Sequence, residues 1–303
     1  MKKKSVFTSI AALMVALFVA TSCEKPVLDE EEQTNPQQEQ KAKGNLILRV
    51  TDFQLVPYEA RSTRAVQNIT DYCSRFNFVI YKGDTKVKAI TQKKEEAENY
   101  GEVSMTLEPG EYKVLVLAHS SKGGNPTLAS AESIQFTNKT SYSDTFYYYS
   151  DITVTSEQKV HNLILSRASS MLRFTIADEI PSNVTSITLH YTGGSGVLNA
   201  VTGYGGDVNS QQEMLYNIEG LSAPITLRIY TFLQNETGKL QLTVTAQDAD
   251  KNTVVERKFT DVPMKRNMAT EYTGSFFDHA SENGFTFKAE TDWEVYNQTT
   301  YSF

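Results

Sequence analysis

The sequence predicts an all-β protein, and three observations support this fold class. Short segments in which every second residue is apolar recur along the chain, a period typical of half-buried strands. Turn-forming residues separate these segments, as at Lys82-Gly83-Asp84. Outside the N-terminal leader, no run of ten residues keeps the 3.6-residue period of an amphipathic helix. With 303 residues, 40% of them hydrophobic, the chain is long enough for two domains, and the pattern divides near Arg167.

The clearest strand of the first half lies within Leu107–His119. Glu108-Pro109-Gly110 predicts a turn, because Pro109 restricts φ and Gly110 tolerates positive φ. Leu115 and Leu117 are apolar on one face, and the other face carries Tyr112, Val114, Val116 and Ala118. We therefore expect a central strand that is covered on both sides. Such a strand, in a chain with many short strands, indicates a β-sandwich.

Further strands are predicted on both sides of this one. In the first half they are Leu46–Val50, Phe76–Ile80, Lys86–Ile90, Phe146–Thr155 and Val160–Leu165. In the second half they are Leu172–Ile176, Ile187–Tyr191, Ile225–Ile229, Leu240–Ala246 and Val254–Phe259. We expect a short helix at Ala129–Gln135 and a glycine-rich loop at Gly193–Gly206.

The first 22 residues have the order of a bacterial lipoprotein signal peptide. Lys2 to Lys4 form a basic region, and Ile10–Ala20 is an apolar region too short to span a bilayer. Small residues then lead directly into Cys23, although Ala20 stands where leucine is usual. We expect residues 1–22 to be removed and Cys23 to carry lipid. An ordinary secretory leader followed by a chance cysteine is the alternative.

Residues 23–43 predict a disordered spacer, because Asp29–Glu32 is acidic and Gln33–Lys43 has no large apolar residue. An acidic run behind a lipidated cysteine also resembles the surface-export signals of Bacteroidota lipoproteins, and a merely soluble linker explains it equally well. Without the leader, 26 basic residues face 36 acidic ones, a formal charge of −10. This charge disfavours nucleic acid as a partner. Once Cys23 is acylated, Cys73 is the remaining thiol and no intramolecular disulfide forms.

No motif for catalysis, cofactor binding or metal binding is complete. Gly193–Gly196 lacks the lysine of a phosphate-binding loop, and Ser195 lacks the glycine two positions later that a nucleophile elbow needs. Asp248-x-Asp250-x-Asn252 opens like a calcium loop, but Thr253 and Phe259 replace the required glycine and glutamate, so a hairpin tip is favoured. No metal-binding spacing connects the four histidines, which are His119, His161, His190 and His279. We expect neither an enzyme nor a cofactor.

The aromatic run Phe146 to Tyr149 has two interpretations. Exposed rings would suit a glycan platform or a protein interface. A strand with rings on both faces at a domain junction is the interpretation we favour.

Several stretches carry a resemblance when they are taken in order. They are Leu107–Ser121, Ser143–Tyr147, Leu163–Ala168, and Val262–Asn267 followed by Thr270 and Gly274. Together they resemble the fimbrial subunits of Bacteroidota type V pili, and most closely the FimB-type fimbrial anchor branch. The resemblance covers Gly44 to Phe303 and extends to the lipoprotein signal. The run Phe146 to Tyr149 departs from it, because the glycine expected after Phe-Tyr is absent.

This resemblance implies two tandem transthyretin-like (Greek-key) β-sandwich domains, residues 44–167 and 168–303. It implies a fimbrial anchor or subunit in adhesion, held at the outer membrane and cell surface by its lipid, with palmitate on Cys23. Other fimbrial subunits would then bind by β-strand addition. The alternative function is that of a surface glycan-binding lipoprotein of a polysaccharide-uptake system, with Tyr147 to Tyr149 and Trp293 as sugar-stacking residues.

The resemblance also directs attention to Arg61 and Arg64. In this superfamily an arginine-specific protease cuts the shaft subunits in the loop after the first strand, and Arg61-Ser62-Thr63-Arg64 follows Leu46–Val50. A plain exposed loop is the alternative. Cleavage would separate the chain from Cys23, so an anchor must keep this loop intact.

The lipid on Cys23 is testable in cells that express the full chain. Metabolic labelling with a palmitate analogue should mark the wild type and leave Cys23→Ala unlabelled, because the acyl chains are attached to this cysteine. Equal label on both proteins would show that the leader is an ordinary secretory peptide.

Overall fold

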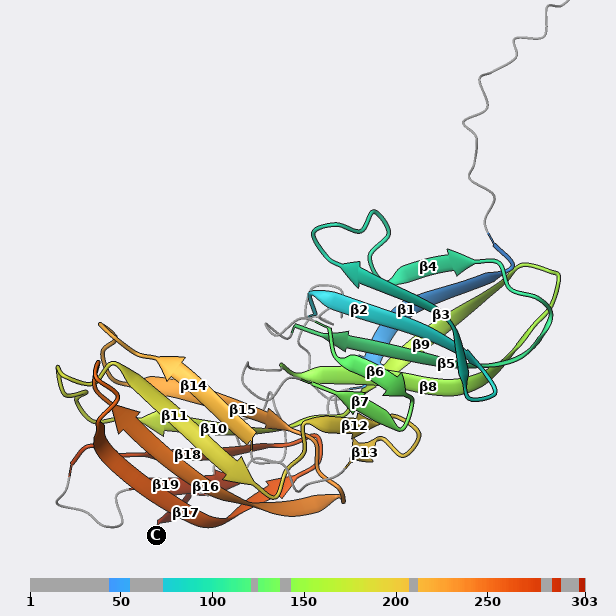
Figure 1. Ribbon diagram of the computed structural model, residues 1–303. Helices are drawn as coiled ribbons and strands as arrows, with labels where there is room; N and C mark the ends of the chain where they lie inside the picture. The colour runs from blue at the N-terminus through green and yellow to red at the C-terminus, as the bar shows by residue number, and fades with distance from the viewer. Residues whose placement is uncertain are drawn as a thin grey trace, which may run out of the picture. The chain divides into compact units, whose positions relative to one another are not determined.

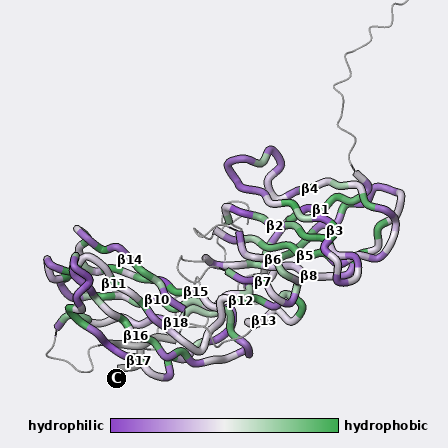
Figure 2. Tube along the Cα trace, viewed as in Figure 1, coloured by the Kyte–Doolittle hydropathy of each residue, from purple (hydrophilic) through white to green (hydrophobic). Residues whose placement is uncertain are grey.

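The computed structural model describes residues 44–54, 73–120, 125–136, 143–206, 212–278, 285–289 and 300–302. All regular structure within these residues is β-strand, so the predicted all-β class is confirmed (Figure 1). This part of the chain contains no helix that is long and apolar enough to cross a membrane. Apolar stretches follow the strands, whereas many of the turns between them are hydrophilic (Figure 2).

The first half of the chain forms a seven-stranded sheet in the order β3-β2-β5-β8-β9-β1-β4. The strands are β1 (Leu46–Gln54), β2 (Arg75–Lys82), β3 (Thr85–Lys93), β4 (Glu102–Met105), β5 (Gly110–His119), β8 (Thr145–Val154) and β9 (Lys159–Arg167). β8 and β9 pair only at Phe146–Arg167 and Tyr147–Ser166. The sheet therefore divides at this point into layers of four and three strands, whose apolar side chains share one core.

β5 is a central strand, since it pairs with β2 along one edge and β8 along the other. Both of its faces are also covered, as expected. Its face with Tyr112 and Val116 packs in the core between the layers. Leu115 and Leu117, on the opposite face, are each 0% exposed. They belong to a second apolar group, the joining cluster, which also includes Val79, Tyr81, Ala131, Ile134, Phe136, Ala168, Leu198, Ala200 and Phe232.

The second half packs two sheets around its own core, with the strand orders β14-β11-β16-β17 and β15-β10-β18-β19-β20. The strands are β10 (Ser170–Ile176), β11 (Ser186–Thr192), β14 (Gln212–Asn217), β15 (Ile225–Thr231), β16 (Thr237–Gln247), β17 (Thr253–Lys265), β18 (Ala269–Gly274), β19 (Phe285–Ala289) and β20 (Thr300–Ser302). Phe174 of β10, Leu189 of β11 and Val244 of β16 are each 0% exposed in this core.

The two halves repeat one strand order. The layers β3-β2-β5-β8 and β9-β1-β4 of the first half correspond to β14-β11-β16-β17 and β18-β10-β15 of the second. β1 and β10 occupy the same place, because each lies between a parallel and an antiparallel neighbour. The halves differ at β18, whose other edge is extended by β19 and β20.

A small sheet joins the halves, and it corrects two expectations. It contains β6 (Thr127–Ser130) and β7 (Ser133–Gln135) from the first half, and β12 (Val197–Asn199) and β13 (Tyr204–Gly205) from the second. The helix expected at Ala129–Gln135 is wrong: the segment is a hairpin, because so short a helix is not stable alone and pairing with β12 satisfies the backbone of β7. The expected loop Gly193–Gly206 likewise contains β12 and β13.

His119 ends β5 inside the protein, with 0% of its surface exposed, and its Nε2 lies 3.0 Å from Oδ1 of Asn77. Burial, and then the positive charge of Arg75, lower the pKa of His119 to about 4 from its ordinary 6.5. Since the folded pKa lies below the unfolded value, the neutral ring stabilises the fold above pH 6.5. This stabilisation is lost as the pH falls from 6.5 through about 4.

We therefore expect the free energy of unfolding of the wild type to fall between pH 6.5 and about 4 by more than that of His119→Gln, with a difference of about 3 kcal/mol. Urea unfolding at a series of pH values measures this difference. The carboxylates of the chain titrate in both proteins, so their effect cancels when the pH profiles of the wild type and His119→Gln are compared. Parallel pH profiles would show that His119 is not held neutral.

Candidate functional site

The stretches that carry the fimbrial resemblance lie far apart in the sequence, and their strands meet where the two halves join. β5 pairs with β8 along its whole length, and β8 pairs with β9 at Phe146 and Tyr147. Arg266, between β17 and β18, contacts Tyr147 of β8. We call this place the joint and define it by Asp144, Tyr147, Arg167, Ser169 and Arg266.

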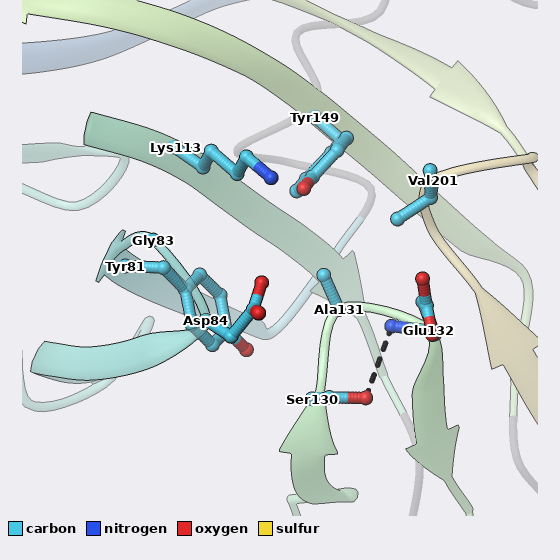
Figure 3. Close-up of a pocket in the computed structure, with 9 residues that line it drawn as sticks. All are labelled: Tyr81, Gly83, Asp84, Lys113, Ser130, Ala131, Glu132, Tyr149 and Val201. Atoms are coloured by element: carbon cyan, nitrogen blue, oxygen red, sulfur yellow. Dashed lines mark hydrogen bonds between the residues drawn. The ribbon is translucent and has the colours of Figure 1, made fainter. Parts of the chain in front are cut away.

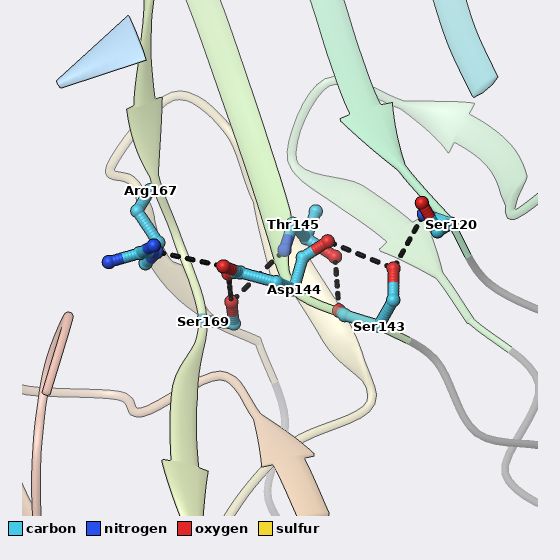
Figure 4. A network of polar contacts seen from close by, with 6 residues as sticks. All are labelled: Ser120, Ser143, Asp144, Thr145, Arg167 and Ser169. Carbon is cyan, nitrogen blue, oxygen red and sulfur yellow. Dashed lines mark hydrogen bonds and ion pairs between the residues drawn. The ribbon is translucent and has the colours of Figure 1, made fainter. Parts of the chain in front are cut away.

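A buried ion pair lies at the centre of the joint (Figure 4). Nε of Arg167 donates to Oδ2 of Asp144 at 3.0 Å, and the two side chains are 1% and 5% exposed. Oγ of Ser169 donates to the other carboxylate oxygen at 2.7 Å and accepts the N–H of Thr145 at 3.1 Å. The Arg167 guanidinium also lies 5.1 Å from the centre of the Phe146 ring. Charges this deeply buried are stable only when they are paired and hydrogen-bonded.

Hydrogen bonds extend this network to the end of β5. Oγ of Ser143 accepts the N–H of Ser120 at 2.6 Å and donates to the carbonyl oxygen of Asp144 at 2.9 Å (Figure 4). The N–H of Ala168 donates to the carbonyl of Thr145 at 2.8 Å. The chain that passes from β9 into β10 is therefore bound to the start of β8.

The second half contributes a cation and a glycine to the joint. The Arg266 guanidinium lies 4.5 Å from the centre of the Tyr204 ring and donates to Oη of Tyr147 at 3.3 Å. Gly203 has a φ of 75°, and a Cβ atom there would lie 1.9 Å from Oη of Tyr147. Only glycine fits this position, for its conformation and for the space.

The aromatic run on β8 is a strand with rings on both faces, as the favoured interpretation expected of the strand itself. Phe146 and Tyr148 pack toward the core between the layers. Tyr147 and Tyr149 pack against the joining cluster on the other face. The three tyrosines are half-buried and do not share one exposed face.

β1 fills a central place in its layer, with β9 on one side and β4 on the other. Leu46, Leu48 and Val50 are buried in the core. At the start of the strand, the amide of Asn45 donates to the carbonyl oxygens of Leu107 and Thr155, at 2.8 and 2.7 Å. An incoming strand that replaced β1 would have to supply both its apolar side chains and its backbone hydrogen bonds.

The remaining predicted sites are distributed as follows. Cys23, Arg61, Arg64, His279 and Trp293 lie outside the described residues. Cys73 is buried, and burial raises the pKa of its thiol. Ser195 is buried, and its Oγ accepts the N–H of Val197 within its own loop. The described residues hold no group of three or more His, Cys, Asp or Glu side chains placed to bind a metal ion.

Asp248–Asn252 forms the predicted hairpin tip between β16 and β17. The Asp248 carboxylate accepts the backbone N–H groups of Asp250 and Asn252 at 3.0 and 2.8 Å. The side-chain amide of Asn252 also donates to this carboxylate, at 3.1 Å. This bond above all, together with the two backbone bonds, lowers the pKa of Asp248. The carboxylate therefore holds the turn.

The described residues thus define an all-β protein whose two halves share a buried polar joint. The chain belongs to a family of unknown function, DUF6562, whose model matches residues 36–303. No curated protein matches the chain.

Several solved structures are similar to it. The fimbrial anchor protein Mfa2 from Porphyromonas gingivalis has 11% identity and a TM-score of 0.45, with coverage of 86% of this chain and 100% of that one. A fimbrial assembly protein from Parabacteroides distasonis has 11% identity and a TM-score of 0.43, with coverage of 86% and 98%. A candidate polysaccharide-binding protein from Bacteroides thetaiotaomicron has 9% identity and a TM-score of 0.47, with coverage of 82% and 96%. These values are too low to transfer the role of any residue to this chain.

The ion pair of the joint can be tested by removing one partner or both. Asp144→Ala should lower the free energy of unfolding by about 3–5 kcal/mol, because it leaves the Arg167 charge buried without its partner. The double variant Asp144→Leu/Arg167→Met should cost less than Asp144→Ala, because no unpaired charge remains. Guanidinium chloride unfolding measures both changes.

The exposed pair Arg49–Glu102 provides the control, with side chains 46% and 26% exposed. Glu102→Gln should cost no more than about 1 kcal/mol. A similar small cost for Asp144→Ala would contradict the role of the ion pair in holding the joint.

Proposed function

We propose that this chain is a lipid-anchored protein of a surface fimbria, acting as the anchor or as a subunit in adhesion. The convergence of the resembling stretches on the joint supports this proposal most. Asp144 and Tyr147 come from one stretch, Arg167 from another and Arg266 from a third; Arg167 pairs with Asp144, and Arg266 donates to Tyr147 three residues further along the chain from Asp144. Short strand-and-turn patterns that matched by chance would have no reason to build one common joint.

The proposal includes two tandem transthyretin-like domains, residues 44–167 and 168–303. The repeated strand order of the halves supports this division. The proposed boundary lies inside the buried network, between Arg167 and Ser169, and not in a polar linker. The two domains would therefore behave as one body.

Attachment to the outer membrane through Cys23 belongs to the same proposal. The basic region, the short apolar region and the cysteine support it, and residues 23–43 would hold the folded part away from the membrane. One acyl chain gives only marginal binding, whereas the two or three chains of a bacterial lipoprotein give a stable anchor. Partner subunits would bind the folded part by β-strand addition.

Retention or loss of β1 would distinguish an anchor from a shaft subunit. The three buried aliphatic side chains of this strand contribute about 1.5–3 kcal/mol each, and each strand hydrogen bond contributes roughly 1 kcal/mol. The sum is comparable to the whole stability of a domain, about 5–15 kcal/mol. If cleavage at Arg61 or Arg64 released β1, the open place would need a strand from a partner. We propose that the chain is an anchor that stays uncut and keeps β1.

N-terminal analysis of the protein recovered from native cell envelopes tests this proposal. We expect a blocked, lipidated Cys23, and an Arg61→Ala/Arg64→Ala variant of the same size as the wild type. A free N-terminus at Ser62 or Ala65 in the wild type, lost in the double variant, would make the chain a shaft or tip subunit.

A further inference from the structure

A cavity of about 290 Å³ opens on the face of the first half that carries β6 and β7. Its walls come from the end of β2, the following turn, β5, β8 and the turn between β6 and β7, and Val201 of the second half completes them. Figure 3 shows Lys113 and Tyr149 on one side of the cavity, Asp84 opposite them, and Val201 and Glu132 on a third side. The volume lies near the lower limit for sites that hold small molecules.

Several polar side chains of this cavity are not used by the fold. Tyr81 is only 3% exposed, and its hydroxyl group has no hydrogen-bond partner among the described residues. Burying a hydroxyl group without a partner is unfavourable. Within the same residues, no ion pair engages the ammonium group of Lys113 or the carboxylates of Asp84 and Glu132. Tyr81 thus places at the cavity wall a hydroxyl group that no described residue uses, and the charges of Lys113, Asp84 and Glu132 are open to a ligand.

The lining restricts the chemistry of that ligand. Two carboxylates disfavour a phosphate or another anion, and the lysine disfavours a metal ion or a simple amine. Carboxylates only accept hydrogen bonds, an ammonium group only donates them, and tyrosine and serine hydroxyl groups do both. A compound with several neutral hydroxyl groups can bond to the carboxylates, the ammonium group and the hydroxyl groups of the cavity at once. The ring of Tyr149 with Ala131 and Val201 supplies apolar surface for the carbon skeleton.

We propose that this cavity binds a single sugar residue at the end or branch of a glycan. The site differs from an aromatic platform, because it is a small hollow with one tyrosine wall and not a row of exposed rings. It includes Val201 and therefore requires both halves in place. An amino acid zwitterion also carries both charges, but it would leave the hydroxyl groups of Tyr81, Tyr149 and Ser130 unused. The proposal does not depend on the fimbrial role.

The test uses the full chain purified in detergent and saturation-transfer NMR. The probes are the methyl glycosides of glucose, galactose, mannose and N-acetylglucosamine, with the dipeptide Ala-Ala as the zwitterionic probe. We expect at least one glycoside to bind in the millimolar range or better. Tyr81→Phe removes only the hydroxyl group and should weaken that binding about tenfold, without lowering the midpoint of thermal unfolding. Glu132→Gln, at an exposed position, should weaken it as well.

Tyr216→Phe is the matched control, since its hydroxyl group bonds to the backbone of Arg228 on β15, far along the chain from the cavity. This variant should bind the glycoside as the wild type does. The proposal is overturned if no glycoside binds, if Tyr81→Phe binds as tightly as the wild type, or if only Ala-Ala binds. None of these results bears on the lipid at Cys23 or on cleavage at Arg61, so the fimbrial proposal is tested separately.

Discussion

The buried network around the ion pair of Asp144 and Arg167 is the constraint that binds the start of the second half to the first, because Ser169 donates to the Asp144 carboxylate. It lies at the one place where β8 and β9 still pair, and the chain enters the second half directly after it. A buried pair loses the hydration of both charges, and hydrogen bonds from neighbouring groups offset part of that loss. Ser169 donates such a bond to the carboxylate, and the N–H of Thr145 orients Ser169. An aromatic ring, Phe146, covers the guanidinium.

The joining cluster complements this polar centre with apolar area. Phe136 of the first half and Phe232 of the second lie with ring centres 5.5 Å apart, and both are almost fully buried. Because β5 is apolar on both faces, its outer face would be exposed without β7 and β12. A contact this apolar is unlike the polar interfaces across which domains usually move. The two halves are therefore held together by an apolar cluster as well as by the polar joint.

The sequence predicted the longer strands with a recognisable apolar face and missed several short ones. Leu240–Ala246 and Ile225–Ile229 were placed correctly because one face is apolar over their whole length. β12 and β13 were missed because they are very short and glycine surrounds them, so that long-range pairing and not local pattern holds them. The ion pair was equally hidden. Asp144 and Arg167 stand at the ends of two apolar strands, a position where a charge is usually exposed, and tertiary packing buries them. The sequence also offered little indication that position 203 must be glycine, since the space for a side chain there is taken by Tyr147, which is distant in the sequence.

The three consecutive tyrosines of β8 show why a cluster in sequence need not be a cluster in space. Successive side chains of a strand point to opposite faces, so Tyr148 enters the core while Tyr147 and Tyr149 face the joining cluster. On that shared face, Tyr147 belongs to the joint and contacts Arg266, whereas Tyr149, two residues further along, lines the cavity. One strand thus connects the joint with the cavity. A displacement of the second half would remove Arg266 from Tyr147 and Val201 from the cavity together, so the integrity of the joint and the shape of the cavity depend on the same packing.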